Sequence, residues 1–384
     1  MKHLPYKAAV ITTFLTITIS SLCAAQKKAN STQSAQEVVN IIHKVNRYWQ
    51  AGHPEHGRPF WDNAVYHTGN MEAYKLTKDK AYLNYSIAWA EHNEWKGAKS
   101  NDRSKWLSNY GETDQHVLFG DWQICFQTYA DLYNLAPQSI KIKRAREVME
   151  YQMQTPKNDY WFWVDALYMV MPTMTKLYNI TRNPLYLEKM HNYVQSTDSV
   201  MYDSNENLYY RDKKYLYPQH KTNNGRKDFW ARGDGWALAA YAKVLAELPK
   251  TDKHRAGYVD KFKKMAKAVA ACQQPEGYWT RSMFDPQQAP GPETSGTALF
   301  SYGILWGINN GLLDRATYEP VVKKSWKYLS TVALQPDGKV GYIQPIGEKA
   351  IPGQIVDANS TYNFGVGVYL LAACEEVKFL KKRK

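Results

Sequence analysis

The chain has 384 residues, a formal net charge of +13 and an aromatic content of 14%, including 29 tyrosines and 13 tryptophans. This length suits one large domain or two ordinary ones. The densest basic runs, at 141–146, 261–267 and 381–384, come with no recognisable nucleic-acid-binding motif. We interpret the excess positive charge as solvated helix faces with a modest preference for acidic ligands.

The first residues have the pattern of a secretory signal peptide. Lys2 and Lys7 precede an apolar run at 8–19, and Cys23-Ala24-Ala25 is a small-residue cleavage site. The run is too short to span a membrane. Leu22 stands where a lipid-attachment motif needs a small residue, so we expect cleavage after Ala25 rather than a lipid anchor at Cys23. The sequence therefore predicts an exported protein, periplasmic or extracellular, with a flexible lead-in at 26–34.

The remainder, 35–384, is predicted to be a single all-helical domain. Apolar residues recur at helical spacing in most of twelve segments, and no Pro/Gly/Ser-rich linker divides them. The segments are 35–51, 60–76, 80–97, 114–135, 139–155, 162–180, 183–200, 230–248, 252–274, 293–311, 316–333 and 359–376. Two short stretches, 207–217 and 339–344, are candidate hairpin arms.

An internal repeat connects some of these segments. The sequence 77–83 (TKDKAYL) resembles 181–187 (TRNPLYL), and each joins the end of one predicted helix to the start of the next. Twelve helices with short connectors that repeat in pairs predict six helical hairpins closed in a ring, an (α/α)6 barrel. We expect inner helices rich in small and aromatic residues, and outer helices that carry the Lys and Glu residues.

The loops before the expected inner helices are rich in aromatic and acidic residues. If the inner helices all run the same way, these loops meet at one end of the barrel and form an aromatic cup with carboxylates for proton transfer. The loops contain Phe60-Trp61-Asp62, Asp114-Gln115-His116, Gly120-Asp121-Trp122, the segment 160–165 with Trp163, the segment 228–236 and the segment 291–297.

The segment 229–236 (FWARGDGW) suits a sugar acid especially well. Trp230 and Trp236 offer flat apolar faces, and Arg232 offers a planar fork for a carboxylate. The alternative is a helix N-terminus with two core tryptophans, and this segment alone does not separate the two interpretations.

Asp165 is the leading candidate for proton transfer. It opens an apolar helix directly after Trp163 and Val164, and desolvation there would raise its pKa as a proton donor requires. Asp121, between Gly120 and Trp122, is the second candidate. Either aspartate could instead be a helix N-cap. The reserves nearby are Asp114, His116 and Asp234.

The chain resembles the unsaturated rhamnogalacturonyl hydrolases, glycoside hydrolase family 105, which are close relatives of the unsaturated glucuronyl hydrolases of family 88. The resemblance covers about 60–375 and is carried by WVDALYMVMP (163–172), FWARGDGWALAA (229–240), PETSGTALFSYGILWGINNGLLD (292–314), DGKVGYIQP (337–345) and YNFGVGVYLLA (362–372). Two departures stand out: the family commonly has Asn at the position of Asp234, and often a paired Asp-Asp near Asp121.

The resemblance implies an (α/α)6 barrel and a hydrolase without metal or other cofactor. Its substrate would carry a 4,5-unsaturated uronic acid at the non-reducing end, as in unsaturated galacturonyl-rhamnose from rhamnogalacturonan. Asp165 matches the family's general acid/base and Asp121 the supporting carboxylate. The positions that match substrate-binding residues are Phe60, Trp61, Trp163, Trp230, Arg232 and Trp236.

Two other classes stay open at this point. The first is an ordinary uronide glycosidase or a polysaccharide lyase on the same barrel, since a lyase would use a Tyr or His base. The second is a sugar-binding protein that keeps the tryptophans without needing Asp165. In each case we expect an acidic oligosaccharide as partner, no nucleic acid, no membrane span, and a monomer or weak homo-oligomer. The cysteines left after cleavage, Cys125, Cys272 and Cys374, predict no disulfide framework.

Overall fold

The computed structural model describes residues 33–54 and 56–382. The predicted signal peptide, its cleavage site and most of the lead-in fall on residues 1–32 and so lie outside the described residues. Within the described ranges, no helix is both long enough and apolar enough to cross a membrane.

The described chain is mostly helical, as predicted, and each of the twelve predicted segments contains a long helix. These helices are α2 (Ala35–Gly52), α3 (Trp61–Thr77), α4 (Lys80–His92), α5 (Cys125–Leu135), α6 (Ile140–Gln154), α7 (Asp165–Thr181), α8 (Leu185–Met201), α9 (Ala231–Glu247), α10 (Arg255–Ala271), α11 (Thr294–Asn309), α12 (Arg315–Tyr328) and α13 (Asn363–Lys381). Short helical turns are η1 (Arg103–Lys105), η2 (Gly120–Trp122), η3 (Lys213–Tyr215) and the π-turn η4 (Leu329–Ala333).

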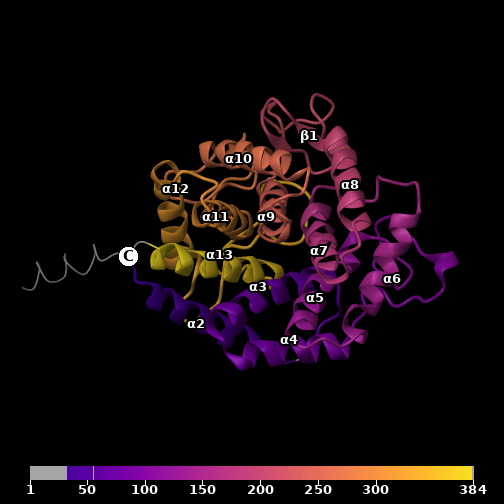
Figure 1. Ribbon diagram of the computed structural model, residues 1–384. Helices are drawn as coiled ribbons and strands as arrows, with labels where there is room; N and C mark the ends of the chain where they lie inside the picture. Colours follow the sequence, from indigo (N-terminus) through magenta and orange to yellow (C-terminus); the bar gives the residue numbers. More distant parts are fainter. Residues whose placement is uncertain (1–32, 55, 383–384) are drawn as a thin grey trace, which may run out of the picture.

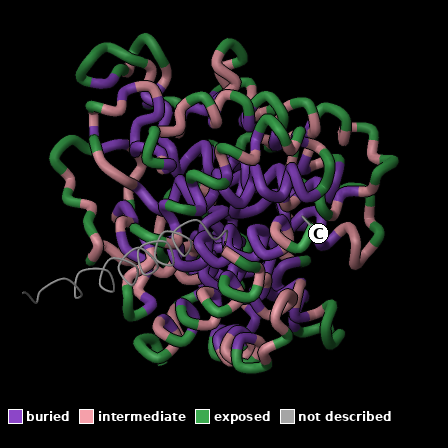
Figure 2. The backbone as a smooth tube through the Cα atoms, turned by 90° about the vertical axis from the view of Figure 1, so that its left-hand side faces the viewer, coloured by how far each residue is buried: buried purple, intermediate pink, exposed green. Residues whose placement is uncertain are grey.

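The odd-numbered helices from α3 to α13 form a closed inner ring. Each packs against the next along the chain, and α13 packs against α3 (Figure 1). The even-numbered helices surround this ring, each beside an inner helix. Burial follows the same division, because every residue of α11 is buried whereas α12 keeps an exposed, charged face. Buried backbone accordingly concentrates at the centre of the molecule (Figure 2). The predicted (α/α)6 barrel is confirmed.

The ring closes where two glycines let helix backbones touch. A Cβ added to Gly69 of α3 would lie 2.0 Å from the carbonyl oxygen of Gly367 in α13. A Cβ on Gly367 would lie 2.5 Å from the carbonyl oxygen of Val65. Because either substitution meets backbone that cannot move away, the close approach of α3 and α13 depends on both glycines.

The repeated connector has the same conformation in both places. Lys78 ends α3 with φ 62°, and Arg182 ends α7 with φ 61°, so both adopt the left-handed conformation that terminates a helix. In each connector the preceding threonine hydroxyl donates to the helix carbonyl four residues earlier. The sequence repeat is therefore a structural repeat.

The predicted strands are mostly absent from the described chain. The strand β1 (Tyr202–Asp203) pairs antiparallel with β2 (Leu208–Tyr209), with Tyr202 opposite Tyr209. After β2 the segment 211–217 becomes an irregular stretch containing η3. The segment 339–344 makes only an isolated bridge at Val340, because its backbone amides bond to carbonyls in separate places, such as Asp357 and Ser360, rather than to one strand.

The predicted segment 114–135 differs most from the structure, since α5 begins only at Cys125. The preceding turn η2 lies against α7, where a Cβ on Gly120 would come within 2.9 Å of the Val170 side chain. This close contact places Asp121 beside α7.

Candidate active site

A cavity of about 740 Å³ opens at the end of the barrel where α3 and α7 begin. Its walls come from the loop before α3, the segment 110–121, the start of α7, the last turns of α8, and the segments 211–214 and 346–348. Aromatic and charged side chains share this lining: Arg58, Phe60, Trp61, Tyr110, Glu112, Phe119, Asp121, Asp159, Trp161, Phe162, Trp163, Asp165, Arg211, Asp212, Lys213, Lys214 and Glu348. The predicted loops around Phe60, Asp121 and Trp163 therefore meet at one barrel end, whereas the segments 228–236 and 291–297 do not line the cavity.

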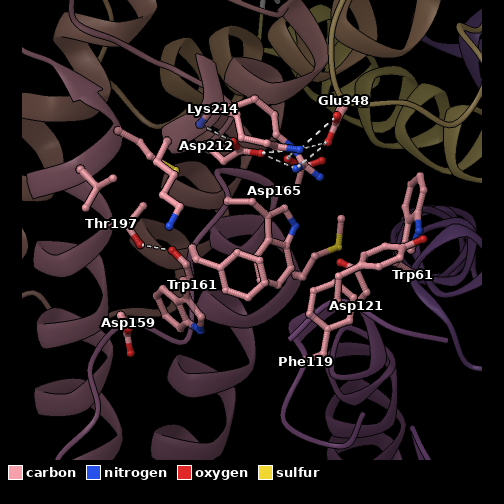
Figure 3. A pocket seen from close by; sticks show the side chains of 18 of the residues that line it. Trp61, Phe119, Asp121, Asp159, Trp161, Asp165, Thr197, Asp212, Lys214 and Glu348 are labelled. Carbon is pink, nitrogen blue, oxygen red and sulfur yellow. Dashed lines mark hydrogen bonds and ion pairs between the residues drawn. The ribbon is translucent and has the colours of Figure 1, made fainter. Parts of the chain in front are cut away.

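Asp165 is the first residue of α7, and its side chain faces the cavity (Figure 3). Val164 occupies the N-cap position, and no side-chain cap hydrogen bond is made there. The Oδ2 atom of Asp165 is buried without a hydrogen-bond partner among the described residues. Burial raises the pKa of the Asp165 carboxyl, and the guanidinium groups of Arg211 and Arg232 partly offset this effect. The N-cap interpretation therefore does not describe Asp165.

Asp121 lies in η2 and is 7% exposed. It makes no side-chain cap hydrogen bond either. Burial raises the pKa of Asp121 well above its ordinary value, and the nearby charge of Asp165 raises it further. The charge of Asp165 therefore makes Asp121 harder to ionise.

None of the three reserve candidates lines the cavity. Asp114 accepts a hydrogen bond from the backbone amide of Lys99 at 2.9 Å. The ring of His116 bonds to the Thr113 hydroxyl at 2.8 Å. Asp234 is fully buried and accepts from the backbone amide of Tyr209 at 2.8 Å. Each of these contacts is structural.

Three of the predicted aromatic contacts line the cavity. Phe60 and Trp61 stand at the start of α3, and Trp163 stands two residues before Asp165. The ring of Trp163 lies 4.6 Å, centroid to centroid, from the rings of both Phe119 and Phe162. Two aromatic walls therefore face the aspartates, and Figure 3 shows Trp61 and Trp161 on opposite sides of the cavity.

Trp230, Arg232 and Trp236 are placed differently from the direct contacts that the sequence predicts. Their exposed fractions are 2%, 1% and 0%, and none of them lines the cavity. Trp236 packs inside the barrel, with its ring 4.7 Å from that of Tyr168. Their burial puts them behind the cavity wall.

Arg232 instead holds part of that wall in place. Its guanidinium donates to the carbonyl oxygens of Gln344 at 2.7 Å and Pro345 at 2.8 Å. Trp230 adds a hydrogen bond from Nε1 to the side chain of Gln344 at 2.9 Å. The residues that follow, Ile346 to Glu348, line the cavity. Arg232 therefore fixes a loop that reaches the site.

A charged group beside Asp165 was missed in the sequence. Arg211 pairs with Asp212 at 2.6 Å and with Glu348 at 3.2 Å, and its Nε lies 3.6 Å from Asp165 Oδ2. Glu348 also accepts from Tyr215 and Lys214. Figure 3 shows Asp212, Lys214 and Glu348 gathered next to Asp165. The only sequence signal was the charged run RDKK, at 211–214, after two tyrosines, and it lay inside a predicted hairpin arm.

No metal centre is formed by the described residues. Within them, no group of three or more His, Cys, Asp or Glu side chains could hold a metal ion. Cys125, Cys272 and Cys374 are all free thiols, and two of them are buried.

Known proteins resemble this chain over nearly its whole length. Residues 27–380 match Glycosyl Hydrolase Family 88. A protein named unsaturated 3S-rhamnoglycuronyl hydrolase from Formosa agariphila is 30% identical over 390 residues, which cover 98% of this chain and 99% of that protein.

Solved structures agree in fold. One named polysaccharide lyase is 72% identical with a TM-score of 0.89, covering 90% of this chain and 98% of its own. One named glycosyl hydrolase family 88 from Bacteroides vulgatus is 67% identical with a TM-score of 0.89, covering 90% of this chain and 100% of its own. A possible member of family 105 from Salmonella enterica shares the fold, with a TM-score of 0.73 at 18% identity over 92% of this chain and 96% of its own. The chain therefore belongs to glycosyl hydrolase family 88.

Proposed function

We propose that this protein removes the 4,5-unsaturated uronic acid from the non-reducing end of oligosaccharides produced by a polysaccharide lyase. One observation carries the proposal: two buried, uncapped carboxyl groups with raised pKa values, Asp165 and Asp121, share an aromatic cavity. Family membership and the printed name of the Formosa agariphila relative support the substrate class.

The chemistry follows from the unsaturated sugar. Its C4=C5 double bond is conjugated to the ring oxygen, so protonation at C4 leaves a cation at C5 that the ring oxygen stabilises. Water adds at C5 and loses a proton, which gives a hemiketal. The hemiketal opens to a ketone at C5 and frees a hydroxyl at C1, and the resulting hemiacetal then releases the linked sugar.

We assign both proton transfers to Asp165. Protonated, it donates to C4; ionised, it accepts the proton of the attacking water. Asp121 supports it by setting the charge around Asp165. Phe60, Trp61 and Trp163 provide the aromatic surfaces for the sugar rings. Trp230, Arg232 and Trp236 are buried and support the cavity wall without contacting the substrate.

Rhamnose is the proposed sugar next to the uronate. Glucuronate and galacturonate differ only at C4, where the double bond removes the difference, so the uronate itself does not distinguish their parent polysaccharides. Unsaturated galacturonyl-rhamnose is the substrate that the resemblance to family 105 implies, and the Formosa agariphila relative is named for a rhamnoglycuronyl substrate. Rhamnose occurs both in the substrate that the resemblance implies and in the substrate for which the relative is named.

We further propose that residues 35–384 form one catalytic domain, that residues 1–25 direct export and are removed, and that the protein acts as a monomer or weak homo-oligomer. Export would place the enzyme where extracellular lyase products accumulate.

A lyase is the second candidate, because the solved structure that is 72% identical to this chain is named a polysaccharide lyase. Lyase chemistry needs a base that removes the proton at C5 of a saturated uronate. In the described cavity wall the phenol of Tyr110 is available for this, but it is 61% exposed and donates to Glu112. The buried carboxyl pair suits protonation of a double bond better.

Ultraviolet absorbance of the conjugated double bond separates the candidates. The protein should be incubated with lyase-generated unsaturated uronyl-rhamnose, with and without a sulfate on the rhamnose, and with the intact polysaccharide. The hydrolase predicts loss of absorbance with release of the next sugar. A rise in absorbance on the polysaccharide, without loss on the disaccharides, would establish the lyase instead.

A further inference from the structure

Arg211 lines the cavity, and its guanidinium keeps donors that make no hydrogen bond to the described chain. The hydrogen bonds of its guanidinium to described residues are made by Nη1, which donates to Asp212 at 2.6 Å and to Glu348 at 3.2 Å. Its Nε is buried without a hydrogen-bond partner, and Nη2 makes no hydrogen bond to the described chain. Two N–H groups on one edge of the guanidinium therefore make no hydrogen bond to the described chain, and on this edge Nε faces the Asp165 carboxyl at 3.6 Å.

This edge matches one kind of ligand. Parallel N–H groups of a guanidinium take the two oxygens of a carboxylate in a bidentate pair, which a lysine cannot reproduce. The two acids on Nη1 keep the guanidinium from rotating, so little side-chain freedom is lost when a ligand binds. The vacant edge is thus oriented in advance for a planar anion.

The other cations near the cavity are less suitable. The Arg232 guanidinium already donates hydrogen bonds to the carbonyls of Gln344 and Pro345, and the residue is only 1% exposed. Arg58 pairs with Glu112 at 2.7 Å on a half-exposed surface. Lys214 pairs with Glu348 at 2.9 Å. Of these cations, only Arg211 combines a fixed position, a place in the cavity and a free bidentate edge.

The position of this edge relative to Asp165 gives it a role. The Nε atom of Arg211 lies 3.6 Å from Asp165 Oδ2, and neither atom has a hydrogen-bond partner among the described residues. In an unsaturated uronate the carboxylate is attached to C5, and C4 is the neighbouring ring atom. A carboxylate on Arg211 therefore sets the double bond beside Asp165.

We propose that the Nε–Nη2 edge of Arg211 binds the carboxylate of the unsaturated uronate, and that Asp212 and Glu348 are positioning residues which hold Arg211 for that purpose. This inference rests on the proposed function and assigns its acid recognition to Arg211 rather than to Arg232.

The test varies the enzyme and the substrate charge together. Unsaturated uronyl-rhamnose and its carboxamide, which is neutral and nearly the same shape, are compared with wild type, Arg211→Gln, Arg211→Lys and Arg232→Lys. Charge-assisted bonds of this kind correspond to roughly 10- to 150-fold. We expect Arg211→Gln to reduce the preference in kcat/KM for the acid over the amide by this factor, and Arg211→Lys to restore part of it. Arg232→Lys should keep the wild-type preference even where its rate is lower.

Retention of the acid preference in Arg211→Gln, or its loss in Arg232→Lys, would overturn the inference. If wild type turns over neither compound, the proposed function fails, and calorimetric binding of the acid and the amide to the same variants still decides the role of Arg211. Circular dichroism of each variant establishes that it is folded. If Arg211→Gln does not fold, the comparison is made with Arg211→Lys.

Discussion

Asp165 Oδ2 lies 3.6 Å from Arg211 Nε, and neither atom has a hydrogen-bond partner among the described residues. The separation exceeds a hydrogen bond, so the guanidinium influences the carboxyl through its charge rather than by a direct bond. Burial raises the pKa of Asp165 and Arg211 lowers it. The proton affinity of the proposed acid/base therefore depends on what occupies the space beside Arg211.

Asp165→Asn should abolish most activity while the fold survives. The substitution removes the group that exchanges protons, and positioned acid–base groups contribute about 10²–10⁴-fold. Because Asp165 makes no cap hydrogen bond, α7 loses nothing that an asparagine would have to replace. Initial rates on an unsaturated uronide and the melting temperature should be measured together. A stable variant with near wild-type turnover would move the proton donor to Asp121.

Asp121→Asn should stabilise the protein near neutral pH. Burial raises the pKa of Asp121, so the folded state binds a proton more tightly than the unfolded chain. The cost of ionising it is absent below the unfolded pKa and grows as pH rises from there toward the folded pKa. We expect a gain in melting temperature on the order of a few °C at pH 7 that shrinks in acid. A gain that is equal at both pH values would show that ionisation is not its source.

The rate profile should fall on the alkaline side at a pH above the usual pKa of a carboxyl group. Activity needs a protonated carboxyl in the pair, so kcat/KM declines as pH rises through its raised pKa. Asp121→Asn removes the coupled acid and should move the decline to lower pH. Arg211→Gln removes a nearby positive charge and should move it to higher pH. Shifts in the same direction for both variants would contradict the assigned coupling.

Arg232→Lys should lower both stability and rate, because the lysine cannot donate to the Gln344 and Pro345 carbonyls together. Arg281→Lys is a matched control: Arg281 is 4% exposed, donates to the carbonyls of Gln354 and Pro290, and lies outside the cavity wall. Melting temperatures should fall by a few °C in both variants, whereas kcat/KM should fall about tenfold or more only in Arg232→Lys. Equal rate losses would remove the special role of the 344–348 loop.

The barrel was predictable because its signals are local. Helical periodicity marks each helix, and the repeated connector places Lys78 and Arg182 in the same left-handed turn. The start of α5 was not predictable, because η2 depends on contact between Gly120 and the side chains of Trp163 and Val170.

The site was predictable in part for the same reason. Asp165 and Trp163 share one stretch of chain, and the structure keeps both in the cavity. Arg232 turns inward because its partners are carbonyls more than a hundred residues away. Arg211 reaches Asp165 through the fold of the segment after β2, and Glu348 reaches Arg211 from the far end of the chain. Contacts between residues so far apart in the sequence cannot be predicted from the spacing of neighbouring residues.

The most direct test of double-bond hydration is the reaction in D2O, followed at early times by NMR. Protonation of C4 by an exchangeable acid predicts one deuterium at C4 of the released uronate, formed at the same rate as the double-bond absorbance disappears and as rhamnose is released. Asp165→Asn should give neither product nor deuterium. Release of rhamnose with the double bond still intact in the uronate, and no deuterium at C4, would contradict hydration and show direct cleavage at the anomeric carbon.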